Sequence, residues 1–101
     1  MTYEIRIDER ALKAIQKTPK KDRKAIFRAI HLLSEQSRPP GTRPLKAADV
    51  ANIYRLRVRN YRVIYQVLDR EVLVYVIRVG NRKDGNRDLI RVIKAREGSR
   101  E

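Results

Sequence analysis

Residues 54–68 read YRLRVRNYRVIYQVL, the most regular pattern in the chain. Apolar and polar residues alternate on both sides of Arg59-Asn60, which predicts two β-strands joined by a tight hairpin loop. Because Arg-Asn is a weaker turn signal than Asn-Gly, we infer the register mainly from the way it sorts the side chains. The predicted pairs are Val58 with Tyr61, Arg57 with Arg62, Leu56 with Val63, Arg55 with Ile64, and Tyr54 with Tyr65.

This register gives the hairpin two unlike faces. One face carries only apolar and aromatic side chains: Tyr54, Leu56, Val58, Tyr61, Val63 and Tyr65. The other face carries the arginines with one apolar and one amide side chain: Arg55, Arg57, Arg62, Ile64 and Gln66. We expect the first face to pack in a core and the second to meet solvent or a ligand.

The residues before the hairpin predict one strand and two helices. Alternation over residues 3–7 predicts a strand, and a helix capped by Asp8 follows to about Gln16. Thr18 as N-cap and Pro19 at the first helical position are expected to start a second helix. The residues expected on the inward faces of these helices are Ala11, Leu12, Ile15, Ile26, Ala29, Ile30 and Leu33.

Prolines predict a loop over residues 38–44, since proline lacks an amide donor and restricts the residue before it. A third strand is expected over residues 72–79, whose nearly continuous apolar character favours a central or doubly covered position. A polar turn over residues 80–86 leads to a short C-terminal helix that ends near Glu97. Residues 1–101 are therefore predicted to form a single α+β domain in the order β-α-α-β-β-β-α, an antiparallel sheet with a helix hairpin on one face.

Composition favours a polyanionic partner. The chain has 25 Lys plus Arg against 12 Asp plus Glu, a formal net charge of +13, and such a field promotes association with nucleic acid. An acidic protein partner, or solubility alone, would use the same surface. Cysteine is absent, which excludes thiolate chemistry and fits a reducing compartment. No apolar run approaches the roughly 20 residues that span a bilayer and no signal peptide is evident, so a cytoplasmic protein is expected.

The paired arginines indicate where an anion would bind. Like charges directly opposite on neighbouring strands are destabilising, so Arg57 facing Arg62 favours a bound anion, although long side chains could also splay apart in solvent. Arg82 follows Gly80 at the end of the third strand, where a loop can aim it back across the same face. Each guanidinium offers a planar fork that matches phosphate oxygens.

Other catalytic chemistry finds little support. His31 is the single histidine and is expected on a helix surface, which excludes a histidine pair for acid–base work. Asp84 and Asp88 are expected in capping or salt-bridge roles. The sequence contains no metal-ligand cluster, phosphate-cradling glycine loop or hydrolase triad, and no cofactor is expected. If the chain is an enzyme, its chemistry depends on arginine.

Four segments carry a family resemblance: Leu45-Lys46, Tyr54 to Val58, Tyr61 to Tyr65, and Val79 to Arg82. In these, and over nearly its whole length, the chain resembles the RelE/ParE superfamily of bacterial toxins, and the RelE branch more closely. The resemblance implies a type II toxin, paired with a cognate antitoxin in a hetero-oligomer, that enters the ribosomal A site and cuts mRNA. The family's catalytic positions fall on Arg55, Arg57, Arg62 and Arg82. We expect further RNA contacts from Lys46, Arg59, Arg78, Lys83 and Arg87.

The implied reaction is attack of an RNA 2'-hydroxyl on the adjacent phosphate, which leaves a 2',3'-cyclic phosphate and a 5'-hydroxyl. Many RelE-type toxins carry a tyrosine after the glycine-basic turn, whereas residues 84–88 here are DGNRD. Some members also have lysine at the position of Arg57, and arginine effectively cannot lose a proton. The general base is therefore unassigned among Lys46, Asp84, Asp88 and a ribosomal group.

Two alternatives remain open from the resemblance. ParE-type relatives share the fold but poison DNA gyrase as binding proteins, and they generally lack the full arginine set. A catalytically attenuated toxin-fold protein is the other alternative. Retention of the four arginines favours the nuclease.

Overall fold

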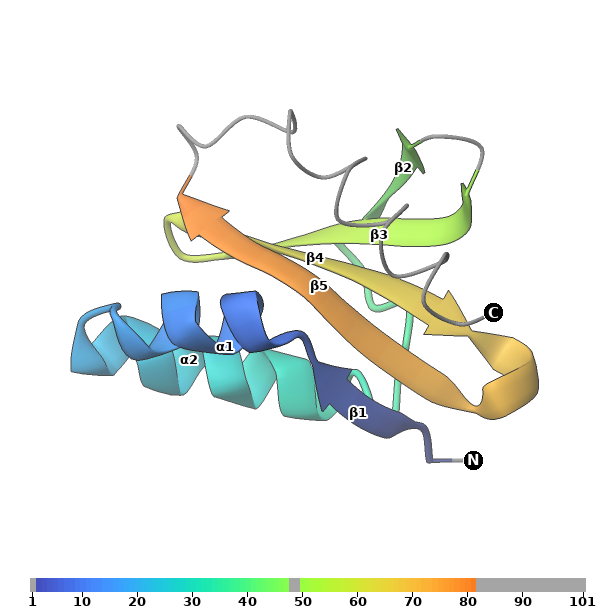
Figure 1. The fold of residues 1–101 in the computed structure, drawn as a ribbon, viewed down its shortest axis with the longest axis horizontal. Coiled ribbons are helices and arrows are strands. Elements are labelled where there is room, and N and C mark those ends of the chain that lie inside the picture. The colour runs from blue at the N-terminus through green and yellow to red at the C-terminus, as the bar shows by residue number, and fades with distance from the viewer. Residues whose placement is uncertain (1, 48–49, 82–101) are drawn as a thin grey trace.

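The central hairpin forms as the alternation predicts. The computed structural model describes residues 2–47 and 50–81, in which β3 (Val50–Val58) and β4 (Tyr61–Leu68) pair antiparallel (Figure 1). All five predicted residue pairs are present in the register. Arg59 opens the loop with a φ of 56°, the left-handed conformation that tight hairpin turns require. Side-chain sorting was therefore sufficient to predict the register.

Three more strands extend the hairpin into a mixed sheet of five strands. β5 (Leu73–Asn81) pairs antiparallel with β4, and β2 (Arg43–Ala47) pairs antiparallel with β3. β1 (Glu4–Ile7) pairs parallel with β5, and the spatial order is β1-β5-β4-β3-β2. β5 is the predicted apolar third strand, and its position between β1 and β4 explains its apolar composition.

The sheet differs from the prediction in two respects. It is not wholly antiparallel, because β1 pairs with a strand distant in sequence and no hairpin constrains its direction. The expected loop over residues 38–44 ends early, since β2 begins at Arg43. An edge strand tolerates Pro44 because one side of its backbone makes no ladder hydrogen bonds. The order over the described residues is therefore β-α-α-β-β-β-β.

Two helices, α1 (Glu9–Gln16) and α2 (Lys20–Leu32), lie together on one face of the sheet (Figure 1). Asp8 caps α1 as predicted, accepting a hydrogen bond from the Arg10 amide at 2.9 Å. The helix hairpin thus lies on the side expected from the apolar face of the strands.

The start of α2 corrects one detail of the prediction. Pro19, not Thr18, occupies the N-cap position, and it makes no side-chain capping bond. The Thr18 hydroxyl instead donates to the Ile15 carbonyl at 2.6 Å. Thr18 therefore satisfies an acceptor at the end of α1, where the last carbonyls lack partners within the helix.

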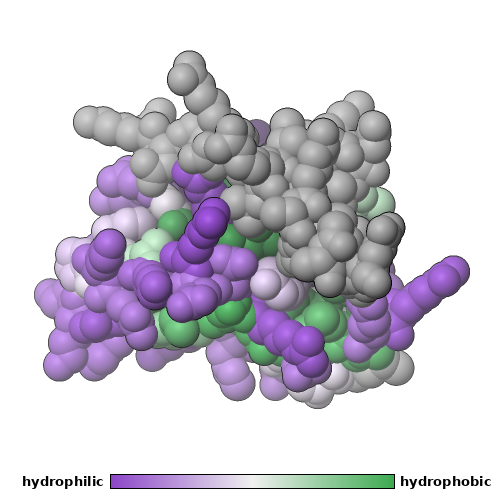
Figure 2. Space-filling model, viewed as in Figure 1, coloured by the Kyte–Doolittle hydropathy of each residue, from purple (hydrophilic) through white to green (hydrophobic). Residues whose placement is uncertain are grey.

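The main core fills the space between the helices and the sheet. Its fully buried members are Ala11, Ile15, Ile26, Ile30, Leu33, Val63, Tyr65, Val67, Val74, Val76 and Val79. Leu12 and Ala29 were expected on the inward faces but are only partly buried. Hydrophilic residues dominate the visible surface over α1 and α2 (Figure 2). None of the helices in the described ranges is long and apolar enough to cross a membrane.

β4 and β5 are joined by a short 3₁₀ turn, Asp69–Glu71, after which Val72 has a φ of 51°. The predicted C-terminal helix, with Leu89, Ile90 and Ile93, lies outside the described residues. The fold that positions the site is thus one sheet with helices on one face and arginines on the other.

Candidate functional site

Arginines gather on the sheet face opposite the helices. Because residues directly opposite on paired strands share a face, the register aligns them in two rows across the sheet. One row is Arg57, Arg62 and Gly80, and the other is Arg43, Arg55, Ile64 and Arg78. We call the five arginines the arginine face: Arg43, Arg55, Arg57, Arg62 and Arg78.

A β-bulge in β5 brings Arg78 onto this face. Ile64 pairs with Arg78 while the next residue, Tyr65, pairs with Val76, so Ile77 is an extra residue on β5. A bulge of this kind places two consecutive residues on one side of the sheet. The period of two could not predict this, because the bulge depends on pairing with β4.

A small buried apolar cluster lies between the arginines. Ile53, Ile64 and Ile77 are its buried members, and Leu45 and Tyr75 pack against it. Ile64 is directly opposite Arg78 in the sheet, and Ile77 precedes Arg78 on β5, so arginine positions flank this cluster. Arg55, Arg62 and Arg78 are half-buried, and a charge with less solvent around it interacts more strongly with a ligand.

The arginine face has no acidic partner within the described part of the chain. The ion pairs formed there use Arg6, Lys13, Arg38 and Arg59. Arg62 is half-buried, and its Nε atom is buried without a hydrogen-bond partner. A buried donor without a partner costs free energy, and an anion at this position would remove that cost.

The electrostatic effect is clearest at Arg55. Burial lowers the pKa of Arg55, and the positive charges of Arg62, Arg43 and Arg57 lower it further. The group remains an arginine whose ordinary pKa is far above neutrality, so it stays charged. Its lowered pKa means that the site holds positive charge against repulsion, as expected of a site that receives an anion.

The other residues predicted to contact RNA do not belong to the arginine face. The Arg59 guanidinium forms an ion pair with Asp22 of α2, with 2.5 Å between Nε and Oδ1, so it points toward the helix side. Lys46 belongs to β2. The remaining predicted site residues lie outside the described ranges: Arg82, Lys83 and Arg87, together with the candidate bases Asp84 and Asp88. His31 is exposed on α2, as expected.

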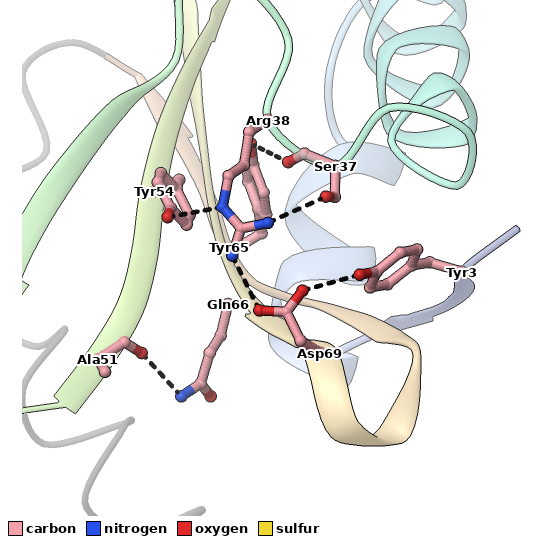
Figure 3. A network of polar contacts seen from close by, with 8 residues as sticks. All are labelled: Tyr3, Ser37, Arg38, Ala51, Tyr54, Tyr65, Gln66 and Asp69. Carbon is pink, nitrogen blue, oxygen red and sulfur yellow. Dashed lines mark hydrogen bonds and ion pairs between the residues drawn. The ribbon is translucent and has the colours of Figure 1, made fainter. Parts of the chain in front are cut away.

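A polar network on the helix side of the sheet involves an arginine that the sequence did not single out (Figure 3). Arg38 donates to the Tyr54 hydroxyl at 2.7 Å and to the Asp69 carboxylate at 3.0 Å. Its guanidinium also lies over the Tyr54 ring, 5.2 Å from the centroid. Tyr3 completes the network by donating to Asp69 at 2.7 Å. We call Tyr3, Arg38, Tyr54 and Asp69 the Arg38 network.

Ser37 and Tyr65 attach this network to the core. The Tyr65 hydroxyl donates to the Ser37 carbonyl at 2.8 Å, and burial raises the pKa of Tyr65 to about 12. The Tyr65 ring stacks on Tyr54 with centroids 5.8 Å apart. The Arg38 network therefore holds the segment between α2 and β2 against the sheet, using residues far apart in sequence that no local pattern could connect.

Gln66 also fastens strands together on the side of the arginine face. Its side-chain amide donates to the Ala51 carbonyl at 3.3 Å, which ties β4 to the start of β3 (Figure 3). The Gln66 carbonyl oxygen is buried without a partner.

Comparison with known proteins assigns this chain to a family. The family model "ParE toxin of type II toxin-antitoxin system, parDE" matches residues 5–85. The mRNA interferase toxin RelE of Escherichia coli K12 is 34% identical over 85 residues, which cover 82% of this chain and 86% of the relative. The mRNA interferase RelE of Shigella flexneri matches equally. This chain therefore belongs to the RelE/ParE family of type II toxin–antitoxin toxins, as a RelE-like member.

Solved structures share the same architecture. A mutant of the E. coli toxin RelE in the free state superposes with a TM-score of 0.67 at 29% identity, covering 93% of each chain. The intact E. coli RelBE toxin–antitoxin complex gives a TM-score of 0.66 at 31% identity, over 81% of this chain and 99% of the other. An archaeal RelE in complex with RelB, from Pyrococcus horikoshii, gives a TM-score of 0.73 at 24% identity, over 84% of this chain and 100% of the other. This similarity shows a shared fold.

Proposed function

We propose that this chain is a ribosome-dependent mRNA endoribonuclease that leaves a 2',3'-cyclic phosphate and a 5'-hydroxyl. The observation that carries the proposal is the pairing of Arg57 with Arg62 beside Arg55, on a face where these arginines have no acidic partner in the described residues. The mRNA interferase activity named for relatives at 34% identity supports it.

The arrangement suits stabilisation of a phosphorane-like transition state. When the 2'-oxygen attacks the phosphorus, additional negative charge develops on the non-bridging oxygens. Arg57 and Arg62 project from neighbouring strands and can donate to those oxygens, with Arg55 adding charge from the next row. Donors fixed before the reaction, at the place where charge develops, commonly supply the largest part of the rate enhancement.

We include Arg82 as the fourth catalytic residue, because its place in the sequence matches a catalytic position of the family. Proton transfer needs another group, because arginine does not act as a base at neutral pH. Lys46, Asp84, Asp88 and a ribosomal group remain the candidates. Arg78, Lys83 and Arg87 are proposed to contact RNA outside the reacting phosphate.

The ribosome has a definite physical role in this proposal. In-line attack requires the 2'-oxygen, the phosphorus and the leaving 5'-oxygen to be aligned, and free RNA seldom adopts that geometry. A ribosome that bends the mRNA would supply the alignment, which is worth several orders of magnitude. We therefore expect feeble cutting of free RNA and efficient cutting of ribosome-bound mRNA.

An acidic or amphipathic antitoxin is the proposed protein partner. Homologous RelE occurs with RelB in the solved E. coli complex, and a net charge of +13 favours an acidic segment here. Binding that depends on exposed charges should weaken as salt is added.

The deciding experiment induces the chain in bacteria without an antitoxin and maps new mRNA 5' ends. We expect ends within translated codons that carry a 5'-hydroxyl. New ends carrying a 5'-phosphate would refute the mechanism, since the attacking group would then not belong to the RNA. Arrest of growth without any new mRNA ends would refute the nuclease itself.

Gyrase poisoning is a second candidate, because the matching family model is described as ParE. A supercoiling assay with purified gyrase separates the two. Inhibition of gyrase that persists in the Arg57→Ala/Arg62→Ala variant, without cutting of ribosome-bound mRNA by the unaltered chain, would establish the second candidate in place of the first.

A further inference from the structure

The arginine face extends to the edge of the sheet through Arg43, a residue outside the predicted catalytic and RNA-binding sets. We propose that Arg43 and Arg55 form a second phosphate subsite, which holds the phosphate next to the one that is cut in single-stranded RNA. This inference rests on the proposed function and deepens it, since it states how the chain grips its substrate beyond the reacting group.

The sheet register places the two subsites side by side. Arg43 is directly opposite Arg55, and Arg57 is directly opposite Arg62. Arg55 and Arg57 are two residues apart on β3, which corresponds to about 6.6–6.8 Å along a strand. Consecutive phosphates of an extended RNA strand have a comparable spacing, so one pair of arginines can take each phosphate.

Arg43 also interacts electrostatically with the arginine face. The positive charge of Arg43 contributes to the lowered pKa of Arg55, so the two guanidinium groups are close enough to repel. Arg43 is exposed, and no ion pair among the described residues includes it. Two arginines directly opposite without an acid destabilise the strand pair, and a phosphate between them would turn that repulsion into attraction.

The backbone around Arg43 is held in place on both sides. Before it, the Thr42 amide and hydroxyl both bond to the Pro39 carbonyl, at 3.2 and 2.8 Å. The Arg38 network fixes the start of the same segment (Figure 3). After it, Leu45 packs on the buried apolar cluster of the arginine face. A cation whose backbone is already fixed loses less entropy when it binds a ligand.

The first test measures binding of a short 2'-O-methyl RNA, which cannot be cut because its 2'-oxygens are blocked. Fluorescence anisotropy over a salt series compares the unaltered chain with Arg43→Ala and Arg28→Ala. Arg28 is an exposed arginine on α2, on the other side of the sheet, so its substitution removes the same net charge away from the face. We expect Arg43→Ala to lower the slope of log K against log salt by about 0.7, the value of one phosphate contact on a single strand. Its affinity should fall roughly two- to fivefold, the range of one exposed ion pair.

The second test locates the phosphate. In single-turnover cutting of ribosome-bound mRNA, a neutral methylphosphonate replaces the linkage on one side of the cut or on the other. One of the two substitutions should slow the unaltered chain roughly two- to fivefold and should not slow Arg43→Ala any further. Equal slowing of both proteins by each substitution would overturn the proposed subsite.

The outcomes separate this inference from the proposed function. An unaltered chain that cuts mRNA while Arg43→Ala matches Arg28→Ala in both assays would overturn only the second subsite. The same conclusion follows if Arg43→Ala weakens an acidic protein partner but not RNA. An unaltered chain that cuts no mRNA would overturn the proposed function, while the salt series would still decide whether Arg43 contacts a phosphate.

Discussion

Arg38 and Arg55 are the same residue type on opposite sides of β3, and their environments differ completely. Arg38 donates hydrogen bonds to the Asp69 carboxylate and to the Tyr54 hydroxyl, and these bonds raise its pKa. Arg55 has neighbours of like charge, and burial together with those charges lowers its pKa. The same side chain is therefore structural on one side of the sheet and available to a ligand on the other.

The difference shows that the basic residues in the described part of this chain fall into two groups, those paired with acids and those without an acidic partner there. With 12 acids for 25 basic residues, the positions of the acids decide which cations are neutralised by the fold. Asp69 and Asp22 lie on the helix side and pair with Arg38 and Arg59. The arginine face keeps its charge without an acidic partner among the described residues, which is the condition that the proposed phosphate site requires.

Substitutions in the proposed catalytic set should reduce the cutting rate most. Arg62→Ala and Arg82→Ala should each lower the rate of ribosome-bound mRNA cutting by roughly 10² to 10³, the cost of removing one transition-state donor. The free energy of unfolding should change by less than about 1 kcal/mol, because no bond within the described fold is lost at Arg62. Single-turnover cutting and urea unfolding measure the two quantities, with Arg28→Ala as the control. Undiminished cutting by the double variant would remove the basis for a catalytic arginine face.

Substitution in the Arg38 network should lower the stability of the fold more than it lowers the rate of cutting. Arg38→Ala should destabilise the fold by about 1–2 kcal/mol, since it removes a partly exposed ion pair, a hydrogen bond to Tyr54 and a cation–π contact. Cutting by the folded protein should fall less than about tenfold, because Arg38 does not touch the arginine face. Urea unfolding and cutting rates normalised to folded protein test this. A loss of cutting as large as that of Arg62→Ala, with stability unchanged, would erase the distinction between the two regions.

A weaker effect is expected on the stability of the fold in acid. Hydrogen bonds from Arg38 and Tyr3 lower the pKa of Asp69 below its ordinary value of 3.8. A carboxyl group with a lowered pKa in the fold contributes stability that is fully present above the unfolded pKa and is lost as pH falls through the folded pKa. Asp69→Asn should therefore lower stability at pH 6 and give a flatter dependence of stability on pH below about 4. Urea unfolding at pH 6, 4 and 3 measures this, and parallel curves for the two proteins would contradict a role of Asp69 as the carboxylate partner of Arg38.

Much of this protein could be predicted from local patterns. The alternation over residues 54–68 predicted the hairpin register and the face on which Arg55, Arg57 and Arg62 lie, because a period of two assigns each residue to one side of a strand. Asp8 was likewise identifiable as a helix cap, since a cap acts on a backbone amide two residues away. These features depend on residues that are close in the sequence, so the local sequence is enough to predict them.

Other features depend on contacts that no local pattern encodes. The prolines predict a loop where β2 begins. The strand forms because this segment pairs with β3 at the edge of the sheet, which its own residues do not indicate. The bulge that turns Arg78 toward the arginine face requires the register between β4 and β5. The sequence predicts only a loop at Arg38, whereas its structural role comes from the bond to Asp69, 31 residues away.

The charge and the strand period follow from the order of the residues alone, and the period shows which arginines share the central hairpin face. By contrast, the pairing of Arg38 and Arg59 with acids, and the position of Arg43 opposite Arg55 at the edge of the sheet, depend on the folded arrangement of distant segments. The physical reason lies in the range of the interactions. Backbone geometry assigns faces within a few residues, whereas ion pairing and strand order depend on which distant segments the packed core brings together.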